Sequence, residues 1–311
     1  MPDVTIRPLC GPDDLVTFNR LQYILDGEYA DDLEQGRRQP GWMWLALRDD
    51  HLVARAAWWG WPGAEQPQLM DVLDVDSSAP DRRDVAVDVV RTALASIGLT
   101  HSPPEYGRFL PAGWQDDPKQ SALVADRTAV IEQLGGRLLV QRLRLQWGPD
   151  ADVPAGAHRL TFRPPSGRGE LLHLLTRVLD DTLDEHSRTE LGTKPPHEFA
   201  RIQLDDEFPH YRGPRDWWAI GCLPDGEPVG FVIPSRNDYS WITYIGVLPE
   251  HRGRGYIDDL LDHGTRVLAS AGAEVIKAST DRANSPMAAA FHRRGYPTAG
   301  ETIDYNFPSG R

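Results

Sequence analysis

The stretch Val247-Leu248-Pro249-Glu250-His251-Arg252-Gly253-Arg254-Gly255-Tyr256 decides the fold of this chain. It follows the apolar, β-branched run Trp241–Val247 and precedes Ile257–Ala271, where apolar residues recur at helical spacing. The segment therefore predicts a strand, a glycine loop and an amphipathic helix in that order. Glycines let several backbone N–H groups face one point, and the start of the helix adds its positive end. This arrangement predicts a phosphate-binding loop.

The loop differs from the two commonest phosphate loops. No Gly-Lys-Ser/Thr follows it, so it is not a P-loop, and its glycine spacing is not that of the dinucleotide fingerprint. Arg252 and Arg254 offer charge-assisted contacts to a phosphate. On these residues alone, a strand-to-helix connector that binds nothing remains the alternative.

The neighbouring segments predict a mixed α/β domain. Two apolar runs, Trp217–Leu223 and Val229–Ile233, flank the turn signal Pro224-Asp225-Gly226-Glu227 and predict a hairpin. After the amphipathic helix, a strand is expected at Glu274–Ala278, followed by a helix that Ser285 caps and that Gly295 ends, and by the extended segment Tyr296–Phe307.

The loop and its downstream partner carry a family resemblance. Val247-x-Pro249-x-x-Arg252-Gly253-Arg254-Gly255-Tyr256 resembles the acyl-CoA pyrophosphate loop of the GNAT superfamily of N-acetyltransferases. Asp281–Met287, followed by Phe291 and Gly295-Tyr296, resembles the second motif of that family. The resemblance covers about residues 158–307 and implies a central mixed, mostly antiparallel sheet flanked by helices.

The resemblance also implies an activity. An amine would attack the thioester of acetyl-CoA directly in a ternary complex, and a backbone N–H near Val247 would stabilise the oxyanion. The implied acceptor is a primary amine of a small molecule or peptide. The residues that the resemblance assigns to the cofactor are Ile245, Gly246, Val247, Arg252, Gly253, Arg254, Gly255, Tyr256 and Asn284.

Two positions depart from the family pattern. Ile257 stands where the family loop usually has Gly or Ala, and Phe291 stands where many members have the tyrosine that protonates the leaving thiolate. Phenylalanine has no proton to donate. Ser285 or Tyr256 is expected to substitute, unless the thiolate leaves without a protein acid.

A general base is not evident in the strand Trp241–Val247. The stretch Leu179–His186 is expected to be helical and to line the acceptor pocket, where Asp181, Asp184, Glu185 or His186 would bind or deprotonate the amine. Glu185 is the named candidate. A solvated helix face is the alternative.

The two halves of the chain repeat one another. Thr5–Leu9 resembles Leu160–Pro164, and Ala93–Gly98 resembles Val267–Gly272 at an offset of 174 residues, the same offset that relates Trp44 to Trp218. These matches predict two tandem domains, 1–148 and 158–311, joined by a linker rich in Pro, Gly and Asp at 149–157.

The first half is predicted to lack an acyl-CoA site. Pro80 to Gly98 spans 18 positions, whereas Pro249 to Gly272 spans 23, so the first copy is shorter where the phosphate loop should be. It also has no glycine in this segment, Ala79–Asp84. Without glycine, the backbone cannot easily present convergent N–H groups.

Composition narrows the remaining classes of function. A net charge of −13 disfavours nucleic acid as a partner, and no apolar run reaches the length of a membrane span. The two cysteines, Cys10 and Cys222, form no disulfide framework, so the reducing cytoplasm is the expected compartment. No metal site is expected, and the chain is expected to be a monomer or a homodimer. Two alternatives to N-acetyl transfer are a longer acyl-CoA donor and a non-catalytic acyl-CoA-binding module.

Overall fold

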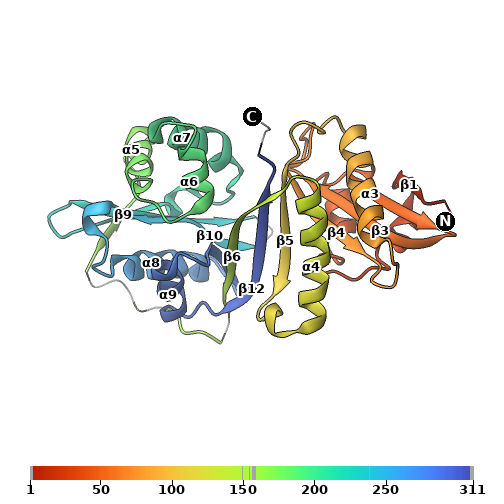
Figure 1. The fold of residues 1–311 in the computed structure, drawn as a ribbon. Coiled ribbons are helices and arrows are strands. Elements are labelled where there is room, and N and C mark those ends of the chain that lie inside the picture. The colour runs from red at the N-terminus through yellow and green to blue at the C-terminus, as the bar shows by residue number, and fades with distance from the viewer. Residues whose placement is uncertain (1–2, 149, 154, 156–158, 238, 309–311) are drawn as a thin grey trace. The chain divides into compact units, whose positions relative to one another are not determined.

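The chain divides into two compact units. The computed structural model describes residues 3–148, 150–153, 155, 159–237 and 239–308. The first unit comprises Met1–Leu139 and Thr302–Arg311, and the second comprises Val140–Glu301 (Figure 1). Each unit is a mixed, mostly antiparallel sheet covered by helices on both faces, as predicted. Among the described helices, none combines the length and the apolar character that crossing a membrane requires.

The first unit contains a five-stranded segment of sheet, in which β1 to β4 are antiparallel neighbours and β5 runs parallel to β4. One apolar core lies under α3 and α4, and a second lies on the other face under α1 and α2. The strands are β1 (Thr5–Pro8), β2 (Met43–Arg48), β3 (His51–Trp59), β4 (Leu69–Val75) and β5 (Glu105–Pro111). The helices are α1 (Pro12–Phe18), α2 (Tyr29–Glu34), α3 (Arg82–Ser96) and α4 (Pro118–Gln133).

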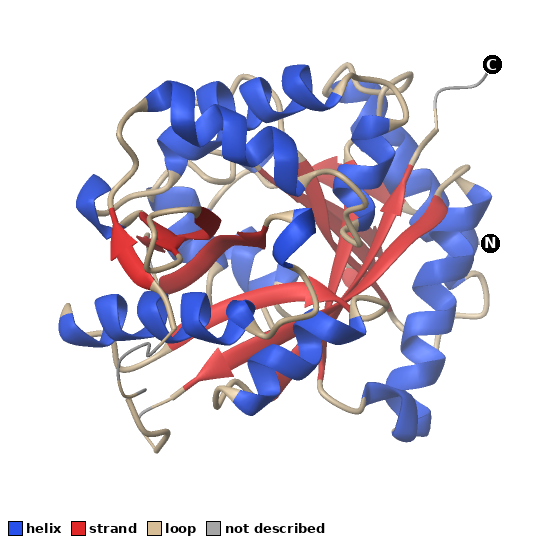
Figure 2. Ribbon diagram, turned by 90° about the vertical axis from the view of Figure 1, so that its left-hand side faces the viewer, coloured by secondary structure: helices blue, strands red, loops and turns tan. Residues whose placement is uncertain are grey.

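The second unit repeats this plan. Its strands β7 to β10 are antiparallel neighbours, and β11 runs parallel to β10. Helices α5 to α7 cover one face of the sheet, whereas α8 and α9 cover the other (Figures 1 and 2). The strands are β7 (Thr161–Arg163), β8 (Ala219–Cys222), β9 (Pro228–Arg236), β10 (Ser240–Val247) and β11 (Ile276–Asp281). The helices are α5 (Arg168–Val178), α6 (Glu185–Leu191), α7 (Pro196–Ile202), α8 (Tyr256–Ser270) and α9 (Ser285–Arg293).

The bounds of equivalent helices confirm the duplication. Adding 174 to the bounds of α3, 82 and 96, gives 256 and 270, which are the bounds of α8. The offset read from Ala93–Gly98 and Val267–Gly272 therefore relates two helices of the same length in the same place along each copy.

The last strands of the two copies are divided between the units. Arg142–Trp147 of β6 (Arg137–Trp147) pairs antiparallel with β11 in the second unit. In β12 (Thr298–Asn306), Ile303 and Tyr305 are buried in a core of the first unit, where the rings of Tyr305 and Tyr106 are 6.3 Å apart.

The predicted domains 1–148 and 158–311 therefore do not coincide with the two units. A sequence repeat follows chain order, but hydrogen bonding between strands does not have to follow it. In the predicted linker 149–157, residues 149, 154, 156 and 157 lie outside the described part of the chain.

The prediction of a helical stretch over Leu179–His186 is wrong. Helix α5 ends at Val178, Asp181 has a φ of 48°, and Asp184 precedes α6 as its cap. The Asp184 carboxylate accepts a hydrogen bond from the N–H of Ser187 at 2.8 Å. Aspartate side chains bond readily to nearby backbone groups, so they favour turns and helix caps over helix interiors.

The cap of α9 also differs from the prediction. Asn284 occupies the cap position, and its Oδ1 accepts a hydrogen bond from the N–H of Met287 at 3.3 Å. Ser285 is the first helical residue and is exposed. Asparagine and serine both suit a cap position. Pro286 lies in the first turn of α9, so the helix starts at Ser285 and the cap position falls on Asn284.

The divided strands predict that neither half folds when it is expressed alone. A fragment 158–311 lacks the β6 strand beside β11, and a fragment 1–148 lacks the buried residues Ile303 and Tyr305. We expect each fragment to aggregate or to show no cooperative thermal transition by circular dichroism. Co-expressed fragments should copurify and unfold cooperatively. A fragment that is monomeric and cooperatively folded without the other would contradict this expectation.

A second prediction concerns His263, whose ring stacks on Phe162 at 3.9 Å. Burial, with the nearby charge of Arg266, lowers the pKa of His263 to about 4 from an ordinary value of 6.5. The folded state thus favours the neutral ring. The resulting stability is fully present above pH 6.5 and is lost as the pH falls toward 4.

Thermal unfolding at pH 7.5 and pH 5.0 measures this contribution. Wild type should lose up to about 2 kcal/mol more than His263→Gln between these two pH values, because glutamine cannot become charged. An equal loss of stability in both proteins would show that His263 does not couple protonation to folding.

Candidate functional site

The glycine loop after β10 has a backbone that only glycine adopts readily. Pro249–His251 forms a single 3₁₀ turn, and Gly253 and Gly255 then have φ angles of 74° and 75°. A Cβ at Gly253 would meet no atom within 4 Å, so conformation and not space requires glycine there. Gly255 occupies the cap position of α8.

The loop presents N–H groups that the protein does not use. The N–H of Asp258 donates to the carbonyl of Gly255 at 3.1 Å and closes the first turn of α8. The N–H groups of residues 253–257 find no acceptor among the described residues. Unused N–H groups at the start of a long helix form a binding site for an anion such as a phosphate.

The side chain of Arg252 forms hydrogen bonds with backbone carbonyls. Its Nε donates to the carbonyl of Val247 at 3.1 Å, and its Nη1 and Nη2 donate to the carbonyls of Asp180 and Val178 at 2.7 and 2.9 Å. The guanidinium thus joins the end of β10 to the C-terminal end of α5. The guanidinium that was expected to contact a phosphate therefore has its three nitrogens bonded to backbone carbonyls.

Another arginine supports the loop from a distant part of the chain. Arg159 donates to the carbonyls of Arg254 and Gly255 at 2.9 and 2.7 Å and lies 2.6 Å from the carboxylate of Asp259. No signal in the sequence identifies Arg159 as part of the loop, because 95 positions separate it from Arg254 and its own segment carries no motif.

The acidic residues in the first turn of α8 have cationic partners. Asp259 pairs with Arg159, and Asp258 lies 2.9 Å from Arg293 at the end of α9. Unpaired carboxylates here would oppose a bound phosphate. These ion pairs therefore preserve the positive potential of the helix start. The side chain of Arg254 is exposed beside them.

Beside the loop, β10 and β11 separate. They pair only at Ser240↔Ile276 and Trp241↔Lys277, whereas β10 continues to pair with β9 up to Val247↔Gly230. The edge of β10 that faces β11 is therefore unpaired over residues 242–247. Such an edge can form hydrogen bonds with an extended amide-containing chain.

Gly246 lets α5 approach this part of β10 closely. A Cβ at Gly246 would lie 3.1 Å from the side chain of Val178. Of the three strand residues expected to bind the cofactor, Val247 already uses its carbonyl for Arg252. Together with Ile245 and Gly246, it borders the gap between β10 and β11.

A charged cluster lies where β11 ends. The buried carboxylate of Asp281 accepts a hydrogen bond from the backbone N–H of Glu185 at 2.6 Å. Arg142 on β6 lies 3.2 Å from Asp281 and 3.5 Å from Asp184. Asp184, His186 and Asp281 place potential ligand atoms within 4.8 Å of one another. Arg142 supplies positive charge to both carboxylates, which reduces their attraction for a metal ion.

The two carboxylates of this cluster differ in acidity. Burial raises the pKa of Asp281, and the negative charge of Asp184 adds to the effect. Burial also acts to raise the pKa of Asp184, but Arg142 and the N–H of Ser187 outweigh it and lower that pKa. Neighbouring acids with opposite shifts are typical of sites that transfer protons.

Tyr244 on β10 extends this polar region toward Glu207. Burial raises the pKa of the Tyr244 hydroxyl, and the charges of Asp184 and Glu207 raise it further. Desolvation likewise raises the pKa of the Glu207 carboxyl, against the effect of a hydrogen bond from the Tyr211 hydroxyl. Glu207 ends the π-helical turn Gln203–Glu207, and no sequence motif distinguishes it.

The expected catalytic residues lie in different surroundings. The Tyr256 ring centroid lies 5.1 Å from the Arg159 guanidinium and 6.1 Å from the His251 ring centroid. Glu185 directs its carboxylate to Arg188 at 2.9 Å, whereas Ser285 is exposed at the start of α9. All three are described residues, and no hydrogen bond joins any two of them.

The cofactor and acid candidates on α9 are also constrained. Phe291 is buried against Tyr296, with ring centroids 5.3 Å apart. The Tyr296 hydroxyl forms a 2.6 Å hydrogen bond with Thr265 inside the core, so this tyrosine does not replace the missing acid. Asn284, expected at the cofactor, uses its carbonyl oxygen as a helix cap.

In the first unit the equivalent gap is filled. Strands β4 and β5 pair only at Leu69↔Glu105 and Met70↔Tyr106, so they also separate. Buried Asp74 on β4 then binds Arg108 on β5 at 3.1 Å and Arg127 on α4, and Arg127 donates to the Leu73 carbonyl at 2.8 Å. These side chains occupy hydrogen-bonding positions that a ligand would need. The first unit therefore has two features that oppose acyl-CoA binding: it lacks the glycine loop, and its gap is filled.

Comparisons with known proteins give one family match and several similar folds. Residues 179–296 match the profile described as acetyltransferase (GNAT) family. A GCN5-related N-acetyltransferase from Sphaerobacter thermophilus is similar in fold, with a TM-score of 0.59 and 16% identity over 98% of this chain and 96% of that chain.

Two further structures are similar along most of the chain. A GCN5-related N-acetyltransferase from Kribbella flavida matches with a TM-score of 0.51 and 15% identity, over 91% of this chain and 94% of that one. A tandem GNAT protein from the clavulanic acid biosynthesis pathway matches with a TM-score of 0.49 and 15% identity, over 99% of both chains. No curated protein sequence matches significantly. Part of the second unit thus matches the acetyltransferase (GNAT) family profile, and the fold of the whole chain is similar to that of a solved GCN5-related N-acetyltransferase.

Proposed function

We propose that this protein is an N-acetyltransferase that moves the acetyl group of acetyl-CoA to a primary amine of a small molecule or peptide. The observation that carries the proposal is the junction of two unused hydrogen-bonding surfaces. The unpaired edge of β10 over residues 242–247 leads directly to the unused N–H groups of residues 253–257. An extended pantetheine amide chain and a pyrophosphate require these two features in this order.

The residues around the loop fit the charge of the cofactor. N–H groups from Gly253 to Ile257 would hold the pyrophosphate, and the exposed guanidinium of Arg254 would add a charge-assisted contact. Ile245, Gly246 and Val247 would border the pantetheine, and Asn284 would approach from α9. The backbone N–H near Val247 would stabilise the oxyanion when the amine attacks the thioester.

The amine must lose a proton before or during attack. A lysine-like amine has a pKa of about 10.4, so its neutral form is rare at pH 7. Glu207 suits the role of base, because a carboxyl with a raised pKa is closer to the working pH than an ordinary glutamate. Glu185, beside Asp281, is the competing candidate.

The leaving thiolate requires no protein acid if water or the ammonium proton reaches it. If a side chain donates the proton, Tyr256 and Ser285 are the candidates. Tyr256 has the more defined position, since it follows the loop directly and packs against His251 and Arg159.

The loop generates the first prediction for this function. Gly253→Ala places a Cβ at a φ of 74° and should weaken acetyl-CoA binding roughly tenfold by opposing the loop conformation. Gly226→Ala is the matched control, because Gly226 has a φ of 93°, is equally open, and lies in the β8–β9 turn.

Calorimetric titration with acetyl-CoA measures the effect. Wild type and Gly226→Ala should bind alike and saturate at one molecule per chain, because Asp74 and its arginines fill the gap of the first unit. Equal weakening in both variants would indicate a general loss of stability. Two equivalent sites per chain would contradict the assignment of a single site.

The base generates a second prediction. Glu207→Gln should lower kcat/KM for acetyl transfer by about 100-fold without changing acetyl-CoA affinity. It should also remove the fall of kcat/KM at low pH that protonation of the base causes. Glu185→Gln is the parallel variant. If it alone changes the pH profile, Glu185 is the base instead. Binding of acetyl-CoA without transfer to any amine of a broad panel would indicate a non-catalytic module.

A further inference from the structure

A cavity lies at the opposite end of α5 from the phosphate loop. Its volume is about 640 Å³, within the range of small-molecule sites. Gly167, Arg168 and Leu171, at the start of α5, line it, whereas Arg252 holds the other end of that helix. The 11 residues of α5 span about 16 Å at 1.5 Å per residue. The cavity is therefore separate from the phosphate loop.

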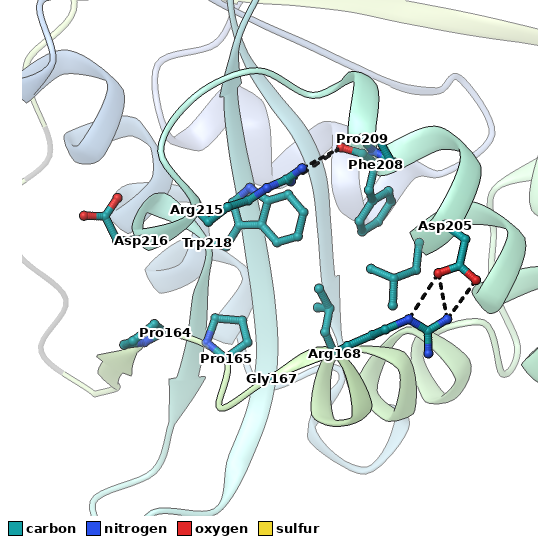
Figure 3. Close-up of a pocket in the computed structure, with 12 residues that line it drawn as sticks. Pro164, Pro165, Gly167, Arg168, Asp205, Phe208, Pro209, Arg215, Asp216 and Trp218 are labelled. Carbon is teal, nitrogen blue, oxygen red and sulfur yellow. Dashed lines mark hydrogen bonds and ion pairs between the residues drawn. The ribbon is translucent and has the colours of Figure 1, made fainter.

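The cavity has an apolar wall. Leu171, Leu204, Phe208 and Trp218 line it. The rings of Phe208 and Trp218 meet edge to face at 5.6 Å (Figure 3). Prolines complete the lining next to Trp218 and Phe208. These surfaces favour a ligand with an aromatic or aliphatic body.

Two arginines line the cavity, and their charges are not equivalent. Arg168 is neutralised by Asp205 at 2.7 Å. Arg215 has no carboxylate partner among the described residues, and it makes only two 3.4 Å contacts to the Phe208 carbonyl. Its guanidinium lies 4.0 Å from the ring centroid of Trp218. Asp216 also lines the cavity, but Figure 3 shows its carboxylate directed away from Phe208.

We propose that this cavity binds a small apolar molecule that carries one carboxylate, with the carboxylate on Arg215 and the apolar body against Phe208 and Trp218. A planar guanidinium pairs with a carboxylate through two parallel hydrogen bonds, which the weak contacts to a carbonyl leave available. Stacking on Trp218 holds the guanidinium in place for this contact.

The cavity adjoins the proposed acceptor side through Phe208. The Phe208 ring lies 5.7 Å from that of Tyr244, whose hydroxyl is influenced by Glu207 and Asp184. The carboxylate ligand is therefore either the acceptor itself, with an amine that extends past Phe208, or a separate ligand of the same chemistry. Binding does not depend on the proposed acetyl transfer, so the two proposals can fail independently.

Calorimetric titration with phenylacetate and with phenylacetamide tests the charge requirement. Wild type should bind phenylacetate at least tenfold more tightly than phenylacetamide. Arg215→Gln should remove this preference and leave phenylacetamide binding within about twofold. Arg212→Gln, which deletes an exposed arginine outside the cavity, should behave as wild type. Equal thermal midpoints of the variants would exclude unfolding as the cause.

Three results would overturn the proposal: no phenylacetate binding at about 20 mM, equal affinity for both probes in wild type, or a preference that survives in Arg215→Gln. A further experiment shows whether the ligand is the acceptor or a separate molecule. If 4-(aminomethyl)phenylacetate is acetylated and Arg215→Gln raises its KM, the cavity holds the acceptor. If phenylacetate binds, and other amines are acetylated but 4-(aminomethyl)phenylacetate is not, the site serves a separate ligand.

Discussion

Hydrogen bonds from Arg252 to three carbonyls join the glycine loop to two neighbouring elements of the second unit. One guanidinium binds Val247 at the end of β10 and Val178 and Asp180 at the end of α5. Positive charge at the C-terminal end of a helix is also favourable to its dipole. Because these bonds set where the loop leaves the sheet, they also set where the N–H groups from Gly253 onward point.

Electrostatic balance around the loop follows from this arrangement. A helix start attracts anions, but α8 carries Asp258 and Asp259 in its first turn. Arg293 and Arg159 neutralise them from other elements, at 2.9 and 2.6 Å. The net charge of −13 therefore says little about the local potential, which depends on a few ion pairs.

The two units differ in what occupies the gap between an equivalent pair of strands. In each unit, the two parallel strands pair at two positions and then separate: β4 and β5 in the first unit, and β10 and β11 in the second. In the second unit, the edge of β10 stays unpaired. In the first, Asp74 and the guanidinium of Arg127 occupy the corresponding space, and the ion pairs are buried. A buried, hydrogen-bonded network of this kind is costly to break, so a ligand would not displace it.

The sequence alone determined the order of elements from the β8–β9 hairpin onward, the duplication and the position of the glycine loop. These features depend on local signals: hydrophobic periodicity, turn residues and the left-handed glycines at 253 and 255. It could not reveal that Arg252 binds carbonyls, that Arg159 returns to the loop, or that Asp184 caps a helix instead of lying within one. Each of these depends on which partner lies nearby.

The tertiary structure alone decided the division of β6 and β12 between the units and the surroundings of Glu207 and Arg215. Strand pairing and side-chain charge couple residues across tens to hundreds of positions, and no local pattern records such partners. Local sequence specifies what each segment can form, whereas packing selects which groups meet and which remain unpaired for a ligand.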